Sequence, residues 1–291
     1  MTTLSSKQRQ VLALPDNCHL TYWRWGQGPN HLLLLHGLAD HGGVWASLAA
    51  HLDTHLAADF QIIAPDLRGH GESSKPAKGY SCAEILSDVY QLCEQLGWSQ
   101  FHLLGHSWGG KLACVWATEQ PERIQSLTLV DPAFVASMPS WLSITFPILY
   151  RTLPFLKAMG PFANRAAAEA AAQTFKQYQG WSNFQAQVFD YSIEPKSGAQ
   201  WGSKFTQAAR DGIFTEMMAV DGLIQPLTMP SLLLLPEAGL NRMAWQLQPY
   251  RQYLENLQEV KVSGNHWPFL VEPTVFNEAV QVFLNNVVLR D

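Results

Sequence analysis

The chain has 291 residues, 47% of them hydrophobic, which is enough for one large domain or for a domain with an insertion. Its net charge of −5 and the lack of a lysine- or arginine-rich block argue against a nucleic-acid partner or an anionic-membrane surface. Residues 1–10 are too polar for a signal peptide and no apolar run reaches the length of a membrane span, so we expect a cytoplasmic protein without stable membrane insertion.

The first part of the chain alternates short apolar strands with helices. Residues 18–25 alternate apolar and polar positions, which predicts a partly exposed strand. Residues 31–35 are almost entirely leucine and predict a buried strand. The glycine-containing segment 36–43 follows at once and lets backbone amides turn toward the space above the sheet, and residues 44–56 predict a helix.

A second strand and helix follow in the same order. Residues 60–64 predict a buried strand, and residues 81–96 have the spacing of an amphipathic helix. Ser81 and Glu84, three residues apart, predict a capping box at its start, and Gly97 is a typical helix stop.

The sequence Gly105-His106-Ser107-Trp108-Gly109 is the main candidate for chemistry. Residues 101–104 predict a buried strand, and residues 110–117 predict a helix packed on it. A strand that turns into a helix within one residue strains that residue and requires small neighbours, which the two glycines provide. The turn would expose the hydroxyl of Ser107 beside the amides of a helix N-terminus.

The regular alternation then breaks and later returns. Residues 125–130 predict a strand, but residues 134–225 contain helix-like stretches, no clear strand and 15 of the 33 aromatic residues, which predicts a helical insertion over an apolar cavity. Strands are predicted again over 231–235 and 257–262. The chain ends in a helix over 273–288, with proline in its first turn.

Three motifs together resemble the α/β-hydrolase superfamily: the serine turn, the pair His36-Gly37, and the segment 66–73, which reads Asp-x-Arg-Gly-x-Gly-x-Ser. The resemblance implies a mostly parallel eight-stranded sheet with helices on both faces. It also implies a core formed by residues 1–133 and 226–291, with a helical cap over 134–225. In that family the 66–73 loop braces turns beneath the site and does no chemistry.

A serine hydroxyl needs a neighbouring base. His266 follows the last strand within Gly264-Asn265-His266, which resembles the family's Gly-x-His pattern, so we expect His266 to lie within a hydrogen bond of Ser107. His106 adjoins Ser107 in the chain, but neighbouring side chains of such a turn diverge, and it is not expected to be the base.

A carboxylate should hold the histidine. The family usually places it in the turn after the strand at 231–235, but Gly239 stands where the aspartate is expected. Asp131, at the end of the preceding core strand, is our first choice because a strand end is rigid. Glu237 is the alternative, and a dyad without an acid is the third.

The remaining site residues follow from the elbow and the resemblance. The amides of Trp108 and Leu38 are expected to form an oxyanion hole, the second of these by resemblance alone. The side chains of Trp108, His36 and Trp267 are expected to contact the substrate. Cys18, Cys82, Cys93 and Cys114 are scattered and predict buried thiols, so we expect neither a metal nor a cofactor.

These observations predict a serine hydrolase, monomeric or homodimeric, that acts on a small hydrophobic carboxylic ester or related carbonyl compound, with the esterases (class EC 3.1.1) as our first choice. Proline iminopeptidase and carbon–carbon bond hydrolase are alternatives within the fold; the first would need cap carboxylates for the substrate amine, with Glu169, Asp190, Glu194 and Glu216 available. A small-molecule receptor that keeps the triad is the alternative that is not an enzyme. Epoxide hydrolase and haloalkane dehalogenase are disfavoured, because those members have an aspartate where Ser107 stands.

Overall fold

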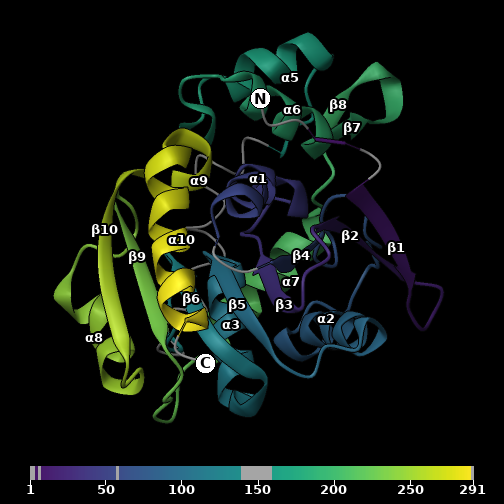
Figure 1. The fold of residues 1–291 in the computed structure, drawn as a ribbon. Coiled ribbons are helices and arrows are strands. Elements are labelled where there is room, and N and C mark those ends of the chain that lie inside the picture. The colour runs from purple at the N-terminus through teal and green to yellow at the C-terminus, as the bar shows by residue number, and fades with distance from the viewer. Residues whose placement is uncertain (1–3, 6–7, 57–58, 139–158, 290–291) are drawn as a thin grey trace.

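The computed structural model describes residues 4–5, 8–56, 59–138 and 159–289. Eight strands form one sheet in the spatial order β1-β2-β4-β3-β5-β6-β9-β10, in which β2 runs antiparallel to both neighbours and all pairs from β4 to β10 are parallel. This confirms the predicted mostly parallel eight-stranded sheet (Figure 1). Their bounds are β1 (Arg9–Ala13), β2 (His19–Trp25), β3 (Asn30–Leu35), β4 (Phe60–Pro65), β5 (Phe101–His106), β6 (Ile124–Val130), β9 (Ser231–Ala238) and β10 (Leu257–Asn265).

Helices cover both faces of the sheet, because successive side chains of each strand point to opposite sides. Leu33 and Leu35 of β3 join the hydrophobic cluster that includes α2, α3 and α7, whereas Leu32 and Leu34 join the cluster that includes α1 and α10. None of the helices within the described ranges is long and apolar enough to cross a bilayer. The core helices are η2 (Gly42–Trp45), α1 (Ala46–His55), α2 (Cys82–Leu96), α3 (Trp108–Glu119), η3 (Pro121–Arg123), α7 (Gln207–Ala219), α8 (Ala244–Tyr253), α9 (Pro268–Val271) and α10 (Pro273–Val288).

The capping signals act as predicted. The Ser81 hydroxyl accepts a hydrogen bond from the Glu84 amide, the Glu84 carboxylate accepts one from the Ser81 amide, and Gly97 ends α2 with a φ of 71°. Helix α10 begins with Pro273.

Helix α7 falls within the predicted cap (134–225), but its buried residues join the hydrophobic cluster of α2 and α3 in the core. The described cap segment 164–203 lies together at the top of the view in Figure 1. It contains α5 (Arg165–Ala172), η5 (Lys176–Tyr178), α6 (Asn183–Ser192), β7 (Ile193–Pro195), η6 (Ser197–Ala199) and β8 (Trp201–Ser203). The antiparallel β7–β8 pair corrects the expectation that this segment holds no strand. Strands of three residues are too short to show the alternation from which strands are predicted. Three of the aromatic residues counted in the predicted insertion, Trp141, Phe146 and Phe155, lie outside the described residues.

The loop after β4 ties the cap to the core. Asp66 is fully buried, and its carboxylate accepts hydrogen bonds from Trp23 Nε1, from Tyr191 Oη and from two backbone amides. Arg68 donates two hydrogen bonds of 2.6 and 2.7 Å to Asp88 of α2. The two charged side chains therefore brace the loop, and one of them also holds α6 of the cap.

Candidate active site

Ser107 lies in a strained turn between β5 and α3. Its φ and ψ are 52° and −116°, in a region that residues with side chains rarely adopt. A Cβ atom on Gly105 would lie 2.3 Å from the Gly109 carbonyl oxygen, and one on Gly109 would lie 2.4 Å from the Leu35 carbonyl oxygen. Both positions therefore require glycine for the strand and the helix to approach as they do.

Two backbone amides beside Ser107 are free to bind an oxyanion. Trp108 is the first residue of α3, so its N–H has no acceptor within the helix. The loop that carries Leu38 passes against the serine, because a Cβ on Gly37 would lie 3.1 Å from Ser107 Cβ. Within the described part of the chain, neither the Trp108 amide nor the Leu38 amide donates a hydrogen bond.

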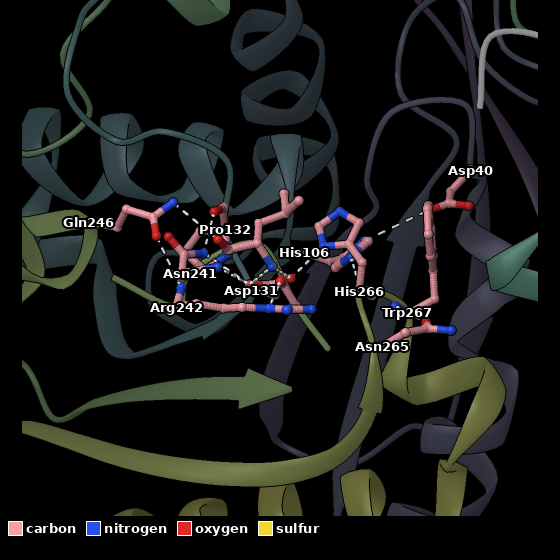
Figure 2. Close-up of polar contacts among 12 residues, drawn as sticks. Asp40, His106, Asp131, Pro132, Asn241, Arg242, Gln246, Asn265, His266 and Trp267 are labelled. Carbon is pink, nitrogen blue, oxygen red and sulfur yellow. Dashed lines mark hydrogen bonds and ion pairs between the residues drawn. The ribbon is translucent and has the colours of Figure 1, made fainter. Parts of the chain in front are cut away.

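The structure brings His266 and Asp131 together, although they lie far apart in the chain. His266 Nδ1 is 2.6 Å from Asp131 Oδ2 (Figure 2). Asp131 directly follows β6, and the carbonyl of its neighbour Val130 accepts a hydrogen bond from the Ser107 amide. The carboxylate and the serine are thus held by the ends of adjacent strands, β6 and β5.

The loop after β9 completes the surroundings of Asp131. The carboxylate accepts hydrogen bonds from the amides of Leu240, at 2.7 Å, and Asn241, at 3.1 Å, and from Asn241 Nδ2 at 3.0 Å (Figure 2). Burial alone would raise the pKa of Asp131, but the hydrogen bonds from His266, Leu240 and Asn241 outweigh it and lower the pKa. Asp131 is therefore ionised at neutral pH and can hold an imidazolium.

Gly239 stands at the position where the family usually has its acid, and the structure shows why it carries no side chain. A Cβ atom on Gly239 would lie between 2.7 and 2.9 Å from the carboxylate atoms of Asp131. The Asp131 carboxylate therefore occupies the space that any side chain at 239 would need. Glu237, the alternative acid, is exposed and makes no hydrogen bond or ion pair with His266 among the described residues.

One expected contact is missing. Over the described ranges, no hydrogen bond joins Ser107 Oγ to His266, so the expectation that the two lie within a hydrogen bond is wrong for this structure. The imidazole is held by Asp131 at Nδ1 and lies against the His106 ring, with the ring centroids 4.6 Å apart and the ring planes tilted by 46°. Hydrogen bonds between a catalytic serine and its base are often long without substrate and tighten only when it binds.

Two predicted substrate contacts need correction. His36 is fully buried; its Nδ1 donates to the Gly37 carbonyl and its Nε2 accepts from the Leu67 amide, so it joins two loops and has no nitrogen left for a substrate. The Trp108 indole is also fully buried, within the hydrophobic cluster around α2 and α3, and cannot line an open pocket.

Trp267 does line a cavity, and this cavity lies between the core and the cap. Its volume is about 30 Å³, enough for one or two water molecules. Leu38 and Trp267 line it from the core, with Tyr178, Phe189 and Ser192 from the cap, and none of its lining residues in the described ranges is a carboxylate. A larger cavity of about 330 Å³ lies at the other end of the strands, around Gly28 and Asp59, far from the carboxyl ends that hold Ser107 and Asp131.

Sequence reasoning missed three contacts of the site: Asn241 with Asp131, Asp40 with Trp267, and His106 with the His266 carbonyl. Asn241 supports Asp131 through both its backbone N–H and its side-chain Nδ2, and the backbone contact has no signal in a sequence. Gly239, which leaves the usual acid position without a carboxylate, is the signal that the loop serves an acid located elsewhere.

Comparison with known proteins agrees with this fold. The family profile described as alpha/beta hydrolase fold matches residues 30–273. A fluoroacetate dehalogenase of a Burkholderia species is 29% identical over 259 residues, which cover 83% of this chain and 82% of that protein. A soluble epoxide hydrolase of Corynebacterium sp. (strain C12) is 35% identical over 100 residues, 34% of each chain.

Two solved structures show the same fold at low sequence identity. An E-2-(acetamidomethylene)succinate hydrolase has a TM-score of 0.77 at 22% identity and covers 95% of this chain and 98% of its own. A marine microorganism esterase has a TM-score of 0.72 at 21% identity, with coverages of 91% and 98%.

Proposed function

The chain belongs to the α/β-hydrolase fold family, and we propose that within it this protein is a serine hydrolase of carboxylic esters or related carbonyl compounds with a hydrophobic group. Ser107 is the nucleophile, His266 the base and Asp131 the acid. The observation that carries the proposal is the 2.6 Å contact between His266 and Asp131, next to a serine at a strained strand-to-helix turn.

The chemistry follows from these positions. Ser107 Oγ attacks the carbonyl carbon of the ester and gives its proton to His266 Nε2, while Asp131 stabilises the imidazolium through Nδ1. The amides of Trp108 and Leu38 bind the oxyanion of the tetrahedral intermediate. The intermediate loses the alcohol, which takes the proton from His266. Water, deprotonated by the same histidine, then cleaves the acyl-enzyme to the carboxylic acid and restores Ser107.

A serine nucleophile argues against dehalogenation and epoxide hydrolysis, the activities for which two of the relatives are named. Attack of a serine oxygen on a carbon–halogen bond or an epoxide carbon would leave an ether on the enzyme, and water does not cleave an ether under these conditions. Attack on a carbonyl gives an ester, which water does cleave. Ser107 therefore favours acyl transfer over dehalogenation or epoxide opening.

Three of the four carboxylates considered for an aminopeptidase have other partners, and Glu169 is not among the described residues that line the cavity beside Leu38. Asp190 pairs with Arg165, Glu194 pairs with Lys196, and Glu216 accepts a hydrogen bond from the Cys82 amide. None of the described residues that line the cavity beside Leu38 is a carboxylate, so they offer no partner for a substrate ammonium group. At about 30 Å³ the cavity is too small to enclose a substrate group, but its largely apolar and aromatic lining favours a neutral, apolar acyl or alcohol group beside it.

Turnover of a panel of p-nitrophenyl esters from acetate to octanoate tests the proposal. We expect steady-state hydrolysis by the wild type and none above background by Ser107→Ala. A wild type that hydrolyses none of the esters, nor a matched panel of thioesters and amides, would contradict the enzyme reading and favour a receptor.

A further inference from the structure

His106 lies one residue before Ser107, and its ring contacts the loop that carries His266. Its Nε2 is 2.7 Å from the His266 carbonyl oxygen, and the edge of its ring packs against Phe269. The side chain is only 1% exposed. The bond therefore spans 160 residues of sequence and joins the serine turn to the start of the loop after β10.

The His266 carbonyl and the burial of the ring together fix which nitrogen of His106 carries a proton. A carbonyl oxygen can only accept, so Nε2 of His106 carries a proton and donates. Burial lowers the pKa of His106, so the ring is neutral and Nδ1 carries a lone pair. Nδ1 has no hydrogen-bond partner among the described residues and lies 3.6 Å from Asp40 Oδ2. The ring thus supplies one fixed donor, and it is aimed at the backbone of His266.

Asp40 holds the next residue of the same loop. Its Oδ2 accepts a hydrogen bond of 3.3 Å from Trp267 Nε1 (Figure 2). Asp40 follows the Leu38 turn and is itself buried. Two neighbouring residues of the loop, His266 and Trp267, are therefore attached to the two segments that carry the serine and the proposed oxyanion amide.

We propose that His106 is a positioning residue, whose Nε2–H holds the His266 backbone at a fixed distance from Ser107. The inference rests on the proposed function. Asp131 fixes Nδ1 of the His266 ring, and His106 fixes the main chain from which that ring projects. Together they determine where His266 Nε2 lies relative to the adjacent serine.

Loss of this donor should affect the chemical step more than substrate binding. A misplacement of about 1 Å in a catalytic group costs roughly a hundredfold in rate. For His106→Phe, which keeps a planar aromatic ring, somewhat larger than imidazole, and removes the donor, we expect kcat on a p-nitrophenyl ester to fall by about 10- to 100-fold, with KM changed less than about twofold. For His106→Gln, whose amide can donate from a similar position, we expect partial recovery of kcat.

His102→Phe is the matched control. His102 lies on the same strand, is equally buried, and bonds to Ser126 Oγ at 2.8 Å, away from the site. We expect it to keep kcat near the wild-type value. A His106→Phe variant with kcat within twofold of the wild type, a Gln variant no better than Phe, or an equal loss in the His102 control would overturn the proposal.

A spectroscopic measurement keeps this test separate from the proposed function. The proton between His266 Nδ1 and Asp131 should give a far-downfield proton NMR signal in the wild type. We expect the signal to shift or broaden in His106→Phe and to persist in His102→Phe. If no ester is hydrolysed, the proposed function fails, and this signal alone decides: an unchanged signal in His106→Phe would refute the positioning role.

Discussion

At the residue scale, the arrangement depends on which carboxylate holds His266. Replacement of Asp131 by Asn keeps the size of the side chain but removes the charge that stabilises the imidazolium, so we expect kcat for ester hydrolysis to fall by about a thousandfold or more. Glu237→Gln is the matched control, because Glu237 is exposed and makes no contact with His266. Initial rates on one p-nitrophenyl ester check both variants. A large loss for Glu237→Gln with little for Asp131→Asn would refute the assignment.

Gly239 offers a steric test of the same carboxylate. In Gly239→Ala the added Cβ would lie within 2.9 Å of three atoms of Asp131, so the carboxylate must move away from His266. We expect kcat to fall at least tenfold. Gly198→Ala controls for loss of stability alone: its φ of 69° makes the substitution costly for the backbone, but the added Cβ meets nothing within 4 Å and displaces no site residue, so we expect its kcat to stay near the wild-type value. Equal activity of Gly239→Ala and the wild type would show that the position of Asp131 does not limit catalysis.

The site residues differ in how well a sequence can reveal them. Ser107 and His266 lie in short motifs whose glycines shape the backbone, so both are recognisable locally. Asp131 is found only by elimination, because Gly239 leaves the usual position without an acid. The absent hydrogen bond between Ser107 and His266, and the burial of the Trp108 indole, depend on packing between distant segments, which local patterns do not encode.

At the element scale, helix α6 of the cap is attached to the core through Tyr191. Its hydroxyl donates a 2.7 Å hydrogen bond to the buried Asp66, and Tyr191→Phe would remove one of the four donors of that carboxylate. A hydrogen bond to a charged group contributes about 1.5–3 kcal/mol, so we expect the free energy of unfolding to fall by about 2 kcal/mol. Urea denaturation measures it.

Tyr178→Phe is the control for that measurement. The Tyr178 hydroxyl lies 3.5 Å from Ser192 Oγ, at the limit of a hydrogen bond, so its loss should cost much less. Equal destabilisation by the two variants would contradict the role given to Asp66.

Most of the core elements are predictable, and two that were missed, β1 and α8, share a cause. The buried parallel strands and the capped helix α2 have strong apolar periodicity or end signals. β1 (Arg9–Ala13) and α8, which contains Pro249, were not predicted because both are largely exposed and carry few apolar residues in register. The place of β1 is decided by pairing with β2, and that of α8 by burial of Leu247 and Tyr250 and by the ion pair between Arg251 and Glu259 of β10.

At the scale of the whole molecule, buried histidines should make the fold sensitive to acid. Burial lowers the pKa of His41 to about 4 and also lowers those of His36, His70 and His106. Below about pH 6.5 the unfolded chain binds protons at these residues that the folded chain does not, so stability falls as the pH falls. For His41 alone the loss between pH 7.5 and 5.5 is about 1.4 kcal/mol.

Urea midpoints at pH 7.5 and 5.5 test this. We expect a lower midpoint at pH 5.5, and a smaller difference between the two pH values in His41→Asn. A midpoint that rises on acidification would contradict the neutral, buried state of these rings.

The central claim is that the fold activates Ser107 through His266, and labelling with a fluorophosphonate tests it most directly. Intact-mass spectrometry of the wild type should show one covalent adduct on Ser107. We expect no adduct on Ser107→Ala and an adduct that forms at least a hundredfold more slowly on His266→Ala. A wild type that remains unlabelled, or a His266→Ala variant labelled as fast as the wild type, would contradict the account.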